Sequence, residues 1–201
     1  MLQLRHLSVL LVLSTLSSAA QDARRSLEKG DSLLMLDRPQ RALPFFDEAI
    51  QLSPSADTYV ARARAHFVMD HMDRFIMDVQ QALRLDSTHA GANYQRAVYA
   101  MRSGDWVLAD KHATTTLEST MDDALRNKAL LLRGEARSER RMPDAAIEDL
   151  RAGITGGADD NESMALLARL LDATGQHDEA LGLLVQLCER EPGNIAHWTN
   201  R

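Results

Sequence analysis

Small residues recur along this chain at a nearly constant interval. Five of them are separated by 33, 34, 37 and 34 residues: Gly30, Ala63, Ala97, Gly134 and Ala168. Twelve residues after each comes a second series: Ala42, Phe75, Ala109, Ala146 and Ala180. A fixed period in this range is the signature of a repeat array, in which each unit is one supersecondary motif. The chain is therefore expected to fold as a stack of similar units.

Further positions follow the second series at helical spacing. Four and seven residues later come two more series: Phe46, Val79, Ala113, Leu150 and Leu184, then Ala49, Ala82, Thr116, Gly153 and Leu187. Residues four and seven apart share one face of an α-helix. Only 4% of the chain is aromatic, while Ala and Leu are abundant, and this bias favours helices over sheets. Each unit is therefore expected to contain two amphipathic helices of about fourteen residues.

The small residues have a packing role in such a unit. A bulky side chain at these positions would push the two helix axes apart, so Gly and Ala allow a close approach. One helical hairpin cannot bury its apolar face alone, and at least three must stack. The chain is 45% hydrophobic and 26% charged, which is typical of a packed protein rather than a disordered one.

This pattern resembles the tetratricopeptide repeat (TPR), a helix–turn–helix of 34 residues with a small residue in the first helix, then Ala, an aromatic residue and Pro. The first unit carries Gly30, Ala42, Phe46, Ala49 and Pro54. The resemblance extends over the region 21–194 as five units: 23–56, 56–89, 90–123, 127–158 and 161–194. It implies an all-α fold, an α-solenoid of about five such hairpins in a right-handed superhelix.

Three features depart from the repeat pattern. The second unit has bulky Phe75 where a small residue is usual. The three extra residues of the longest interval fall near 119–123, and the run 114–116 is three threonines, which are weak helix formers. After the fifth unit, residues 195–201 are expected to be a short cap or the start of a sixth repeat.

The N-terminus has the composition of a secretory signal. Arg5 precedes the uncharged apolar run 7–16, and Ser18 and Ala20 form a small-x-small cleavage motif. We expect residues 1–20 to be removed by cleavage after Ala20, with Ala19 as a near-equal second site. The alternative is a membrane anchor, but a bilayer span takes about 20 apolar residues. The mature protein is then expected to be exported to a bacterial periplasm or the exterior, without stable membrane insertion.

Removal of Arg5 with the signal changes the formal charge from −6 to −7. An acidic protein is a poor nonspecific ligand for nucleic acid, so no nucleic-acid partner is expected. The single cysteine, Cys188, cannot form an internal disulfide. In an oxidising compartment it would be a buried thiol, an intermolecular bridge or a reactive group.

Three acidic segments invite a chemical interpretation. In the run 177–179, His-Asp-Glu, His177 lies eleven residues before Cys188, about 16 Å of helical rise, which is too far for a catalytic pair or a shared metal. Its acids suit a helix N-terminus. The acidic segments 159–162 and 122–123 lack the ligand pattern of a calcium loop and are expected to cap helices. No catalytic, cofactor-binding or metal-binding residue is predicted, and no enzyme activity.

By resemblance, the first helix of each hairpin lines a concave groove. The predicted partner-binding residues there are Arg64, Phe67, Tyr94, Val98, Met101, Arg102, Leu131 and Glu135. Asp31 in the first unit, and Ala165, Arg169 and Asp172 in the fifth, occupy equivalent positions. Arg and Tyr beside apolar groups are typical of binding hot spots, and such a groove suits a peptide or a partner helix.

These observations lead to two hypotheses about function. The first is a non-catalytic, exported scaffold that binds a peptide or a partner protein in its groove. The alternative is a structural or assembly factor of the cell envelope that acts through its C-terminal edge or by self-association.

Overall fold

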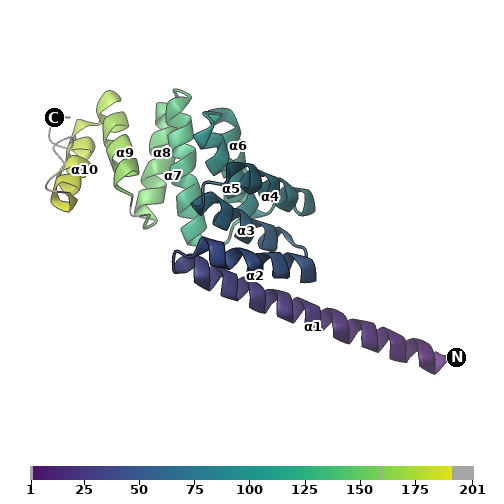
Figure 1. The fold of residues 1–201 in the computed structure, drawn as a ribbon. Coiled ribbons are helices and arrows are strands. Elements are labelled where there is room, and N and C mark those ends of the chain that lie inside the picture. The colour runs from purple at the N-terminus through teal and green to yellow at the C-terminus, as the bar shows by residue number, and fades with distance from the viewer. Residues whose placement is uncertain (1, 159, 192–201) are drawn as a thin grey trace. The chain divides into compact units, whose positions relative to one another are not determined.

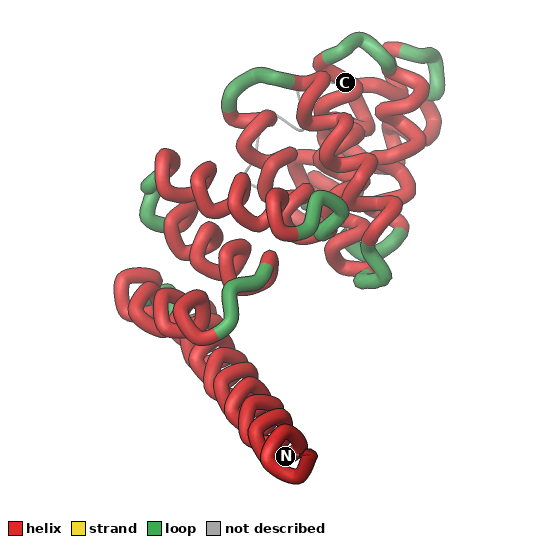
Figure 2. Tube along the Cα trace, turned by 90° about the vertical axis from the view of Figure 1, so that its right-hand side faces the viewer, coloured by secondary structure: helices red, strands yellow, loops and turns green. Residues whose placement is uncertain are grey.

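The computed structural model describes residues 2–158 and 160–191, and these residues form ten α-helices and no strand (Figures 1 and 2). The helices are α1 (Leu2–Met35), α2 (Pro39–Leu52), α3 (Ala56–Val68), α4 (Met72–Leu85), α5 (Ala90–Arg102), α6 (Trp106–Ser119), α7 (Asp123–Glu139), α8 (Pro143–Thr155), α9 (Asn161–Ala173) and α10 (His177–Arg190). The all-α fold predicted from the sequence is confirmed. The expected cap or sixth repeat, 195–201, lies outside the described residues.

The helices divide into two compact units, the first ending at Ala92 and the second beginning at Asn93. In the first unit α1 packs on α2, α2 on α3, and α3 on α4. In the second unit α6 packs on α7, α7 on α8, α8 on α9, and α9 on α10. Within each unit, these helices therefore contact mainly their neighbours in sequence, as in a repeat array. The right-handed superhelix of the whole array stays a prediction.

The small residues lie where helices meet. All five members of the first series are buried. A Cβ added to Gly30 would lie 2.4 Å from Cε1 of Phe46, and one added to Gly134 would lie 2.7 Å from Cγ of Leu150. No real side chain tolerates such contacts, so glycine is required for this helix spacing. The predicted close approach of the two helices of a hairpin is confirmed.

The turn inside each hairpin repeats one backbone feature. Two residues before every second helix, the chain adopts a positive φ, at Asp37, Asp70, Gly104, Arg141 and Gly175. This left-handed conformation is easy for glycine and costly for most other residues. Only two of the five turns use glycine, so the glycine pattern of the sequence does not reveal this repeat.

The extra residues of the longest repeat interval lengthen a helix. The first helix of that unit, α7, has 17 residues, whereas α3, α5 and α9 have 13 each. The additional turn lies at its start. Phe75, the bulky departure in the second unit, is fully buried, and its ring centroid lies 5.3 Å from that of Phe67.

Side-chain caps begin several helices. Asp122 accepts a hydrogen bond from the Leu125 N–H at the start of α7. Asp160 accepts hydrogen bonds from the backbone N–H groups of Glu162 and Ser163 at the start of α9. Both acidic segments thus cap helices, as predicted from the sequence.

The acids at the start of α10 have a different role. The N-cap residue, Gln176, makes no side-chain cap, and Glu179 instead pairs with Arg151 of α8 through two contacts of 2.9 Å. His177 Nδ1 lies 2.8 Å from Asp172 Oδ1. Cys188 is free and only 9% exposed, which agrees with the first of the three alternatives, a buried thiol. Among the described helices, none is long and apolar enough to span a bilayer.

Candidate functional site

In the first unit, the predicted surface of the first helices contains one ion pair. Arg64 of α3 is exposed, and its Nη1 lies 3.4 Å from Oδ1 of Asp31 on α1. Burial raises the pKa of the Asp31 carboxyl, and the charge of Arg64 partly offsets this effect. Phe67 is half-buried against Phe75. The pair is close to solvent, so its contribution to stability is small.

In the second unit, the predicted residues divide into buried and accessible groups. Tyr94, Val98 and Met101 are partly buried against a cluster that joins α5, α6 and α7, and burial raises the pKa of Tyr94. Arg102 is exposed at the end of α5. Leu131 is only 8% exposed, because it packs in the core beside Gly153 of α8. Leu131 therefore offers little surface to a ligand, and we leave it out of the binding surface.

Glu135 opens onto a pocket of about 340 Å³ between α7 and α9. The other lining residues are Asp160, Glu162, Ser163, Ala165, Leu166 and Arg169. By resemblance, Glu135, Ala165 and Arg169 were all expected on the first-helix surface, and the structure brings them together. The sequence did not place Asp160 and Glu162 there, because their capping pattern already accounted for them. We call this set of seven residues the acidic pocket.

The acidic pocket has an unbalanced charge, with three carboxylates and one guanidinium. Burial raises the pKa of Glu135, and the negative charges of Asp160, Glu139 and Glu162 raise it further. A cationic group in the pocket would reverse these charge effects and favour the ionised carboxylate. The pocket is therefore suited to a Lys or Arg side chain.

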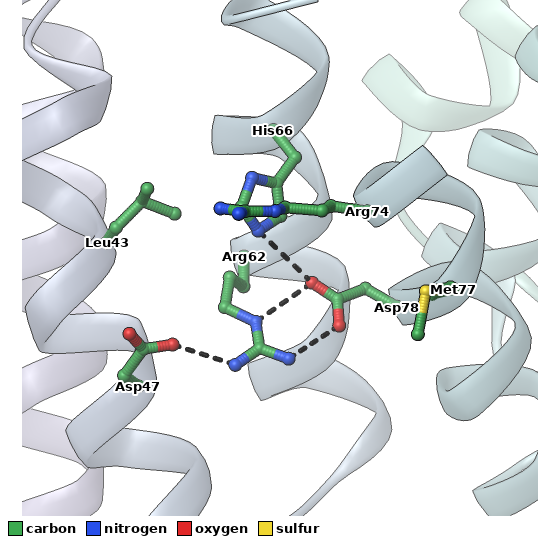
Figure 3. A pocket seen from close by; sticks show the side chains of 7 residues that line it. All are labelled: Leu43, Asp47, Arg62, His66, Arg74, Met77 and Asp78. Carbon is green, nitrogen blue, oxygen red and sulfur yellow. Dashed lines mark hydrogen bonds and ion pairs between the residues drawn. The ribbon is translucent and has the colours of Figure 1, made fainter. Parts of the chain in front are cut away.

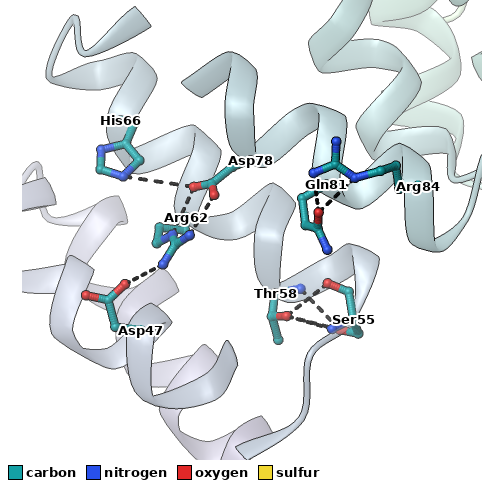
Figure 4. Close-up of polar contacts among 8 residues, drawn as sticks. All are labelled: Asp47, Ser55, Thr58, Arg62, His66, Asp78, Gln81 and Arg84. Atoms are coloured by element: carbon teal, nitrogen blue, oxygen red, sulfur yellow. Dashed lines mark hydrogen bonds and ion pairs between the residues drawn. The ribbon is translucent and has the colours of Figure 1, made fainter. Parts of the chain in front are cut away.

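A second cavity, of about 320 Å³, lies among α2, α3 and α4 of the first unit (Figure 3). It is lined by Leu43, Asp47, Arg62, His66, Arg74, Met77 and Asp78. Arg62 donates to both carboxylate oxygens of Asp78, at 2.9 and 2.6 Å. Its Nη1 also donates to Asp47 of α2 at 2.7 Å (Figure 4). The hydrogen bond to Asp78 raises the pKa of Arg62. We call this cavity the α2–α4 pocket; sequence reasoning did not find it.

The Arg62–Asp78 pair has a counterpart in the second unit. Arg133 of α7 donates to both oxygens of Asp149 on α8, at 2.8 and 2.7 Å, and each pair spans 16 residues of sequence. Arg137, four residues after Arg133, donates to Asp149 and Asp110. Each arginine–aspartate pair thus joins the two helices of a hairpin. This recurrence indicates that the pair is part of the framework of the repeat.

Metal chemistry has no visible support in the described part of the chain. Within it, no group of three or more His, Cys, Asp or Glu side chains is arranged to hold a metal ion.

Comparison with known proteins adds information about the fold. No protein-family model and no curated protein sequence matches the chain. Among solved structures it is similar to YrrB, described as a TPR protein with an unusual peptide-binding site, at 17% identity and a TM-score of 0.67, covering 92% of this chain and 96% of that one. It is similar to TTC0263, a TPR protein of Thermus thermophilus, at 19% identity and a TM-score of 0.59, covering 89% and 96%.

A third similar structure is MamA from Desulfovibrio magneticus RS-1, at 16% identity and a TM-score of 0.66, covering 86% of this chain and 97% of that one. At such low identity these similarities concern the fold. The chain has the tetratricopeptide-repeat fold.

Proposed function

We propose that this chain is an exported, non-catalytic module that binds a peptide or a partner protein along its first helices. The observation that carries the proposal is the acidic pocket. Three of its lining residues were expected on the binding surface: Glu135, Ala165 and Arg169. Its charge favours a ligand with a basic side chain. YrrB, which has the same fold, is described as having a peptide-binding site, and this description supports the general class of ligand.

A peptide-display screen with the mature protein tests the proposal. We expect the selected peptides to be enriched in Lys and Arg, and Glu135→Lys to abolish that enrichment because it reverses the charge at the pocket. Glu118→Lys is the matched control, since Glu118 is exposed on α6 and does not line the pocket. Identical peptides from all three proteins would refute the assignment of the site.

The pH dependence of binding provides a second readout in the same screen. The pKa of Glu135 is raised in the free protein, whereas a bound cation favours the ionised form. Binding therefore releases a proton and weakens as the pH falls through the raised pKa. The Glu118→Lys control should retain this dependence.

The packing of α1 is compatible with removal of residues 1–20, on which the proposed export rests. From Ser18 onward, where its side chains are described, the first buried residue is Ala23, followed by Ser26 and Gly30. The N-terminal half of α1 projects past α2 (Figure 1). Cleavage after Ala20 would leave the packed face of α1 intact.

We expect the mass of the exported chain to correspond to an N-terminus at Gln21, or at Ala20 for the second cleavage site. Ala20→Phe places a bulky residue in the small-residue motif and should impair cleavage at the first of these sites. An exported chain that retains Met1 would contradict the cleavable signal.

A further inference from the structure

His66 occupies the position in the first unit that Arg137 has in the second. Each lies four residues after the arginine of the arginine–aspartate pair that joins its hairpin. The Arg137 guanidinium bonds Asp149 and Asp110 there. Arginine is always charged, whereas histidine gains its charge only by taking up a proton near neutral pH. The first unit thus has a titrating side chain where the second has a permanent charge.

A second exchange accompanies the histidine. Asp110 directly follows the residue of the second series on α6, and Leu43 has the same position on α2. Leu43 lines the α2–α4 pocket together with His66 (Figure 3). The side chain that corresponds to a carboxylate partner of Arg137 is therefore apolar beside His66. Both exchanges favour a neutral imidazole over a charged one.

The His66 ring is buried without a hydrogen bond. The residue is 6% exposed, and its Nδ1 atom is buried with no hydrogen-bond partner among the described residues. Nε2 lies 3.9 Å from Oδ2 of Asp78, which is too far for a hydrogen bond (Figure 4). Both oxygens of Asp78 already accept hydrogen bonds from Arg62. A proton gained by the ring would place a second positive charge beside a carboxylate that is already paired.

The charges that face His66 also disfavour its protonated form. Burial of the ring is the largest cause that lowers the pKa of His66, and the Asp78 carboxylate on α4 opposes this shift. Three basic side chains of α3, α4 and the turn between them lower the pKa further: Arg62, Arg74 and His71. From α2, Asp47 faces Arg62, with which it pairs at 2.7 Å. The folded first unit therefore resists protonation of this ring.

We propose that His66 makes the first unit acid-sensitive, because a proton gained by its buried ring loosens the packing of α3 against α2 and α4. The unfolded chain exposes the ring to water and takes up the proton more readily. The contribution of the neutral ring to stability is therefore fully present above the ordinary pKa of histidine, about 6.5. It is lost as the pH falls from there through the lowered pKa of the folded protein. The acid sensitivity does not depend on the proposed function.

The helix that carries His66 also carries part of the predicted binding surface. Arg64 pairs with Asp31 of α1 at 3.4 Å, and the Phe67 ring packs against Phe75 of α4. Loosening of α3 moves these side chains relative to α1 and α4. Acid should therefore weaken a ligand contact made by Arg64 or Phe67, and this consequence alone rests on the proposed function.

Amide hydrogen exchange of α3 in the full mature chain, combined with an NMR titration of the His66 ring, tests the proposal. The exchange gives the opening equilibrium constant of the helix at each pH. We expect this constant to rise between about pH 8 and a pH well below the measured pKa. The rise should be about tenfold for each unit by which the pKa of His66 lies below its value in the unfolded chain. A pKa of His66 at or above about 6.5 would overturn the proposal.

Two variants assign the rise to the buried ring. His66→Asn replaces the ring by a polar side chain that does not titrate, so the rise should be lost. His71→Asn removes the exposed histidine whose ring centroid lies 5.9 Å from that of His66, and most of the rise should remain. A rise that persists unchanged in His66→Asn, or that is lost to the same extent in His71→Asn, would contradict the assignment.

A further pair of variants keeps the buried ring in place. Arg74 is exposed on α4, so Arg74→Gln should leave the fold intact and remove one of the charges that oppose protonation. We expect the pKa of His66 to increase and the rise in the opening constant to become smaller. Arg84→Gln is the matched control, because Arg84 lies on the same helix and its guanidinium bonds Gln81. Changes in the rise that do not follow the measured pKa of His66 across these variants would refute the link.

Discussion

Replacement of Phe46 by alanine is expected to lower the free energy of unfolding by about 3–5 kcal/mol. Phe46 is fully buried in a cluster with Ala42, Ala61 and Ala65, whose short side chains cannot reach into the space that its ring would leave. Its ring fills the space that Gly30 leaves between α1 and α2. Because neighbouring helices can close only part of such a cavity, most of this cost should appear in urea denaturation.

Two comparisons test this explanation of the Phe46 effect. Phe45→Ala changes the half-buried neighbour on α2 and should cost clearly less. Gly30→Ala alone should destabilise the protein, because the new methyl group meets the Phe46 ring. In the protein that already carries Phe46→Ala, the same substitution should be neutral or stabilising. Strict additivity of the two substitutions would contradict the Gly30–Phe46 contact. Hydrogen exchange of α1 and α2 would detect unfolding confined to this hairpin.

Replacement of Asp149 by alanine is expected to cost about 3 kcal/mol. Asp149 is 4% exposed and accepts hydrogen bonds from both Arg133 and Arg137. Its removal leaves the Arg133 guanidinium, only 16% exposed, without a counter-charge, and leaves Arg137, 21% exposed, with Asp110 alone. Since these groups retain some water, the cost lies at the lower end of the range for a broken buried ion pair. Urea denaturation of the variant measures it.

Two controls distinguish the loss of the ion pairs of Asp149 with Arg133 and Arg137, here called the Asp149 network, from a general effect of removing a negative charge. Asp178→Ala removes an exposed acid of α10 and should change stability by less than about 0.5 kcal/mol. Arg133→Met should lower the free energy of unfolding less in the Asp149→Ala protein than in the wild type. In the Asp149→Ala protein the Arg133 charge is already unpaired, and the substitution removes it. A cost for Asp149→Ala as small as that for Asp178→Ala would show that the network contributes little.

The fold was largely predictable from the sequence because its determinants are local and periodic. The small residues at Gly30 and Gly134 mark the closest helix contacts, and Asp122 and Asp160 mark helix starts. The positive φ at Asp37, Asp70 and Arg141 was not predictable, since aspartate only tolerates this conformation and arginine rarely adopts it. There the hairpin geometry overrides the local preference of the chain.

The candidate sites were only partly predictable. The resemblance to the repeat family placed Glu135 and Arg169 on the first-helix surface, but it also placed Leu131 there, and the Leu131 side chain packs in the core. Neighbouring positions on a helix differ in direction by about 100 degrees. The repeat pattern does not define the start of each helix closely enough to tell which of two neighbouring residues faces the surface. The α2–α4 pocket brings together residues of three helices, and no local signal in the sequence connects Leu43, His66 and Arg74.

The most direct test of the proposed function is the affinity of a Lys- or Arg-containing peptide for the acidic pocket, measured by calorimetry at neutral pH. The wild type and Glu118→Lys should bind equally. Glu135→Lys should bind at least about tenfold more weakly, a loss of about 1.4 kcal/mol. Equal affinity of all three proteins would show that the pocket does not select the ligand and would contradict the proposed function.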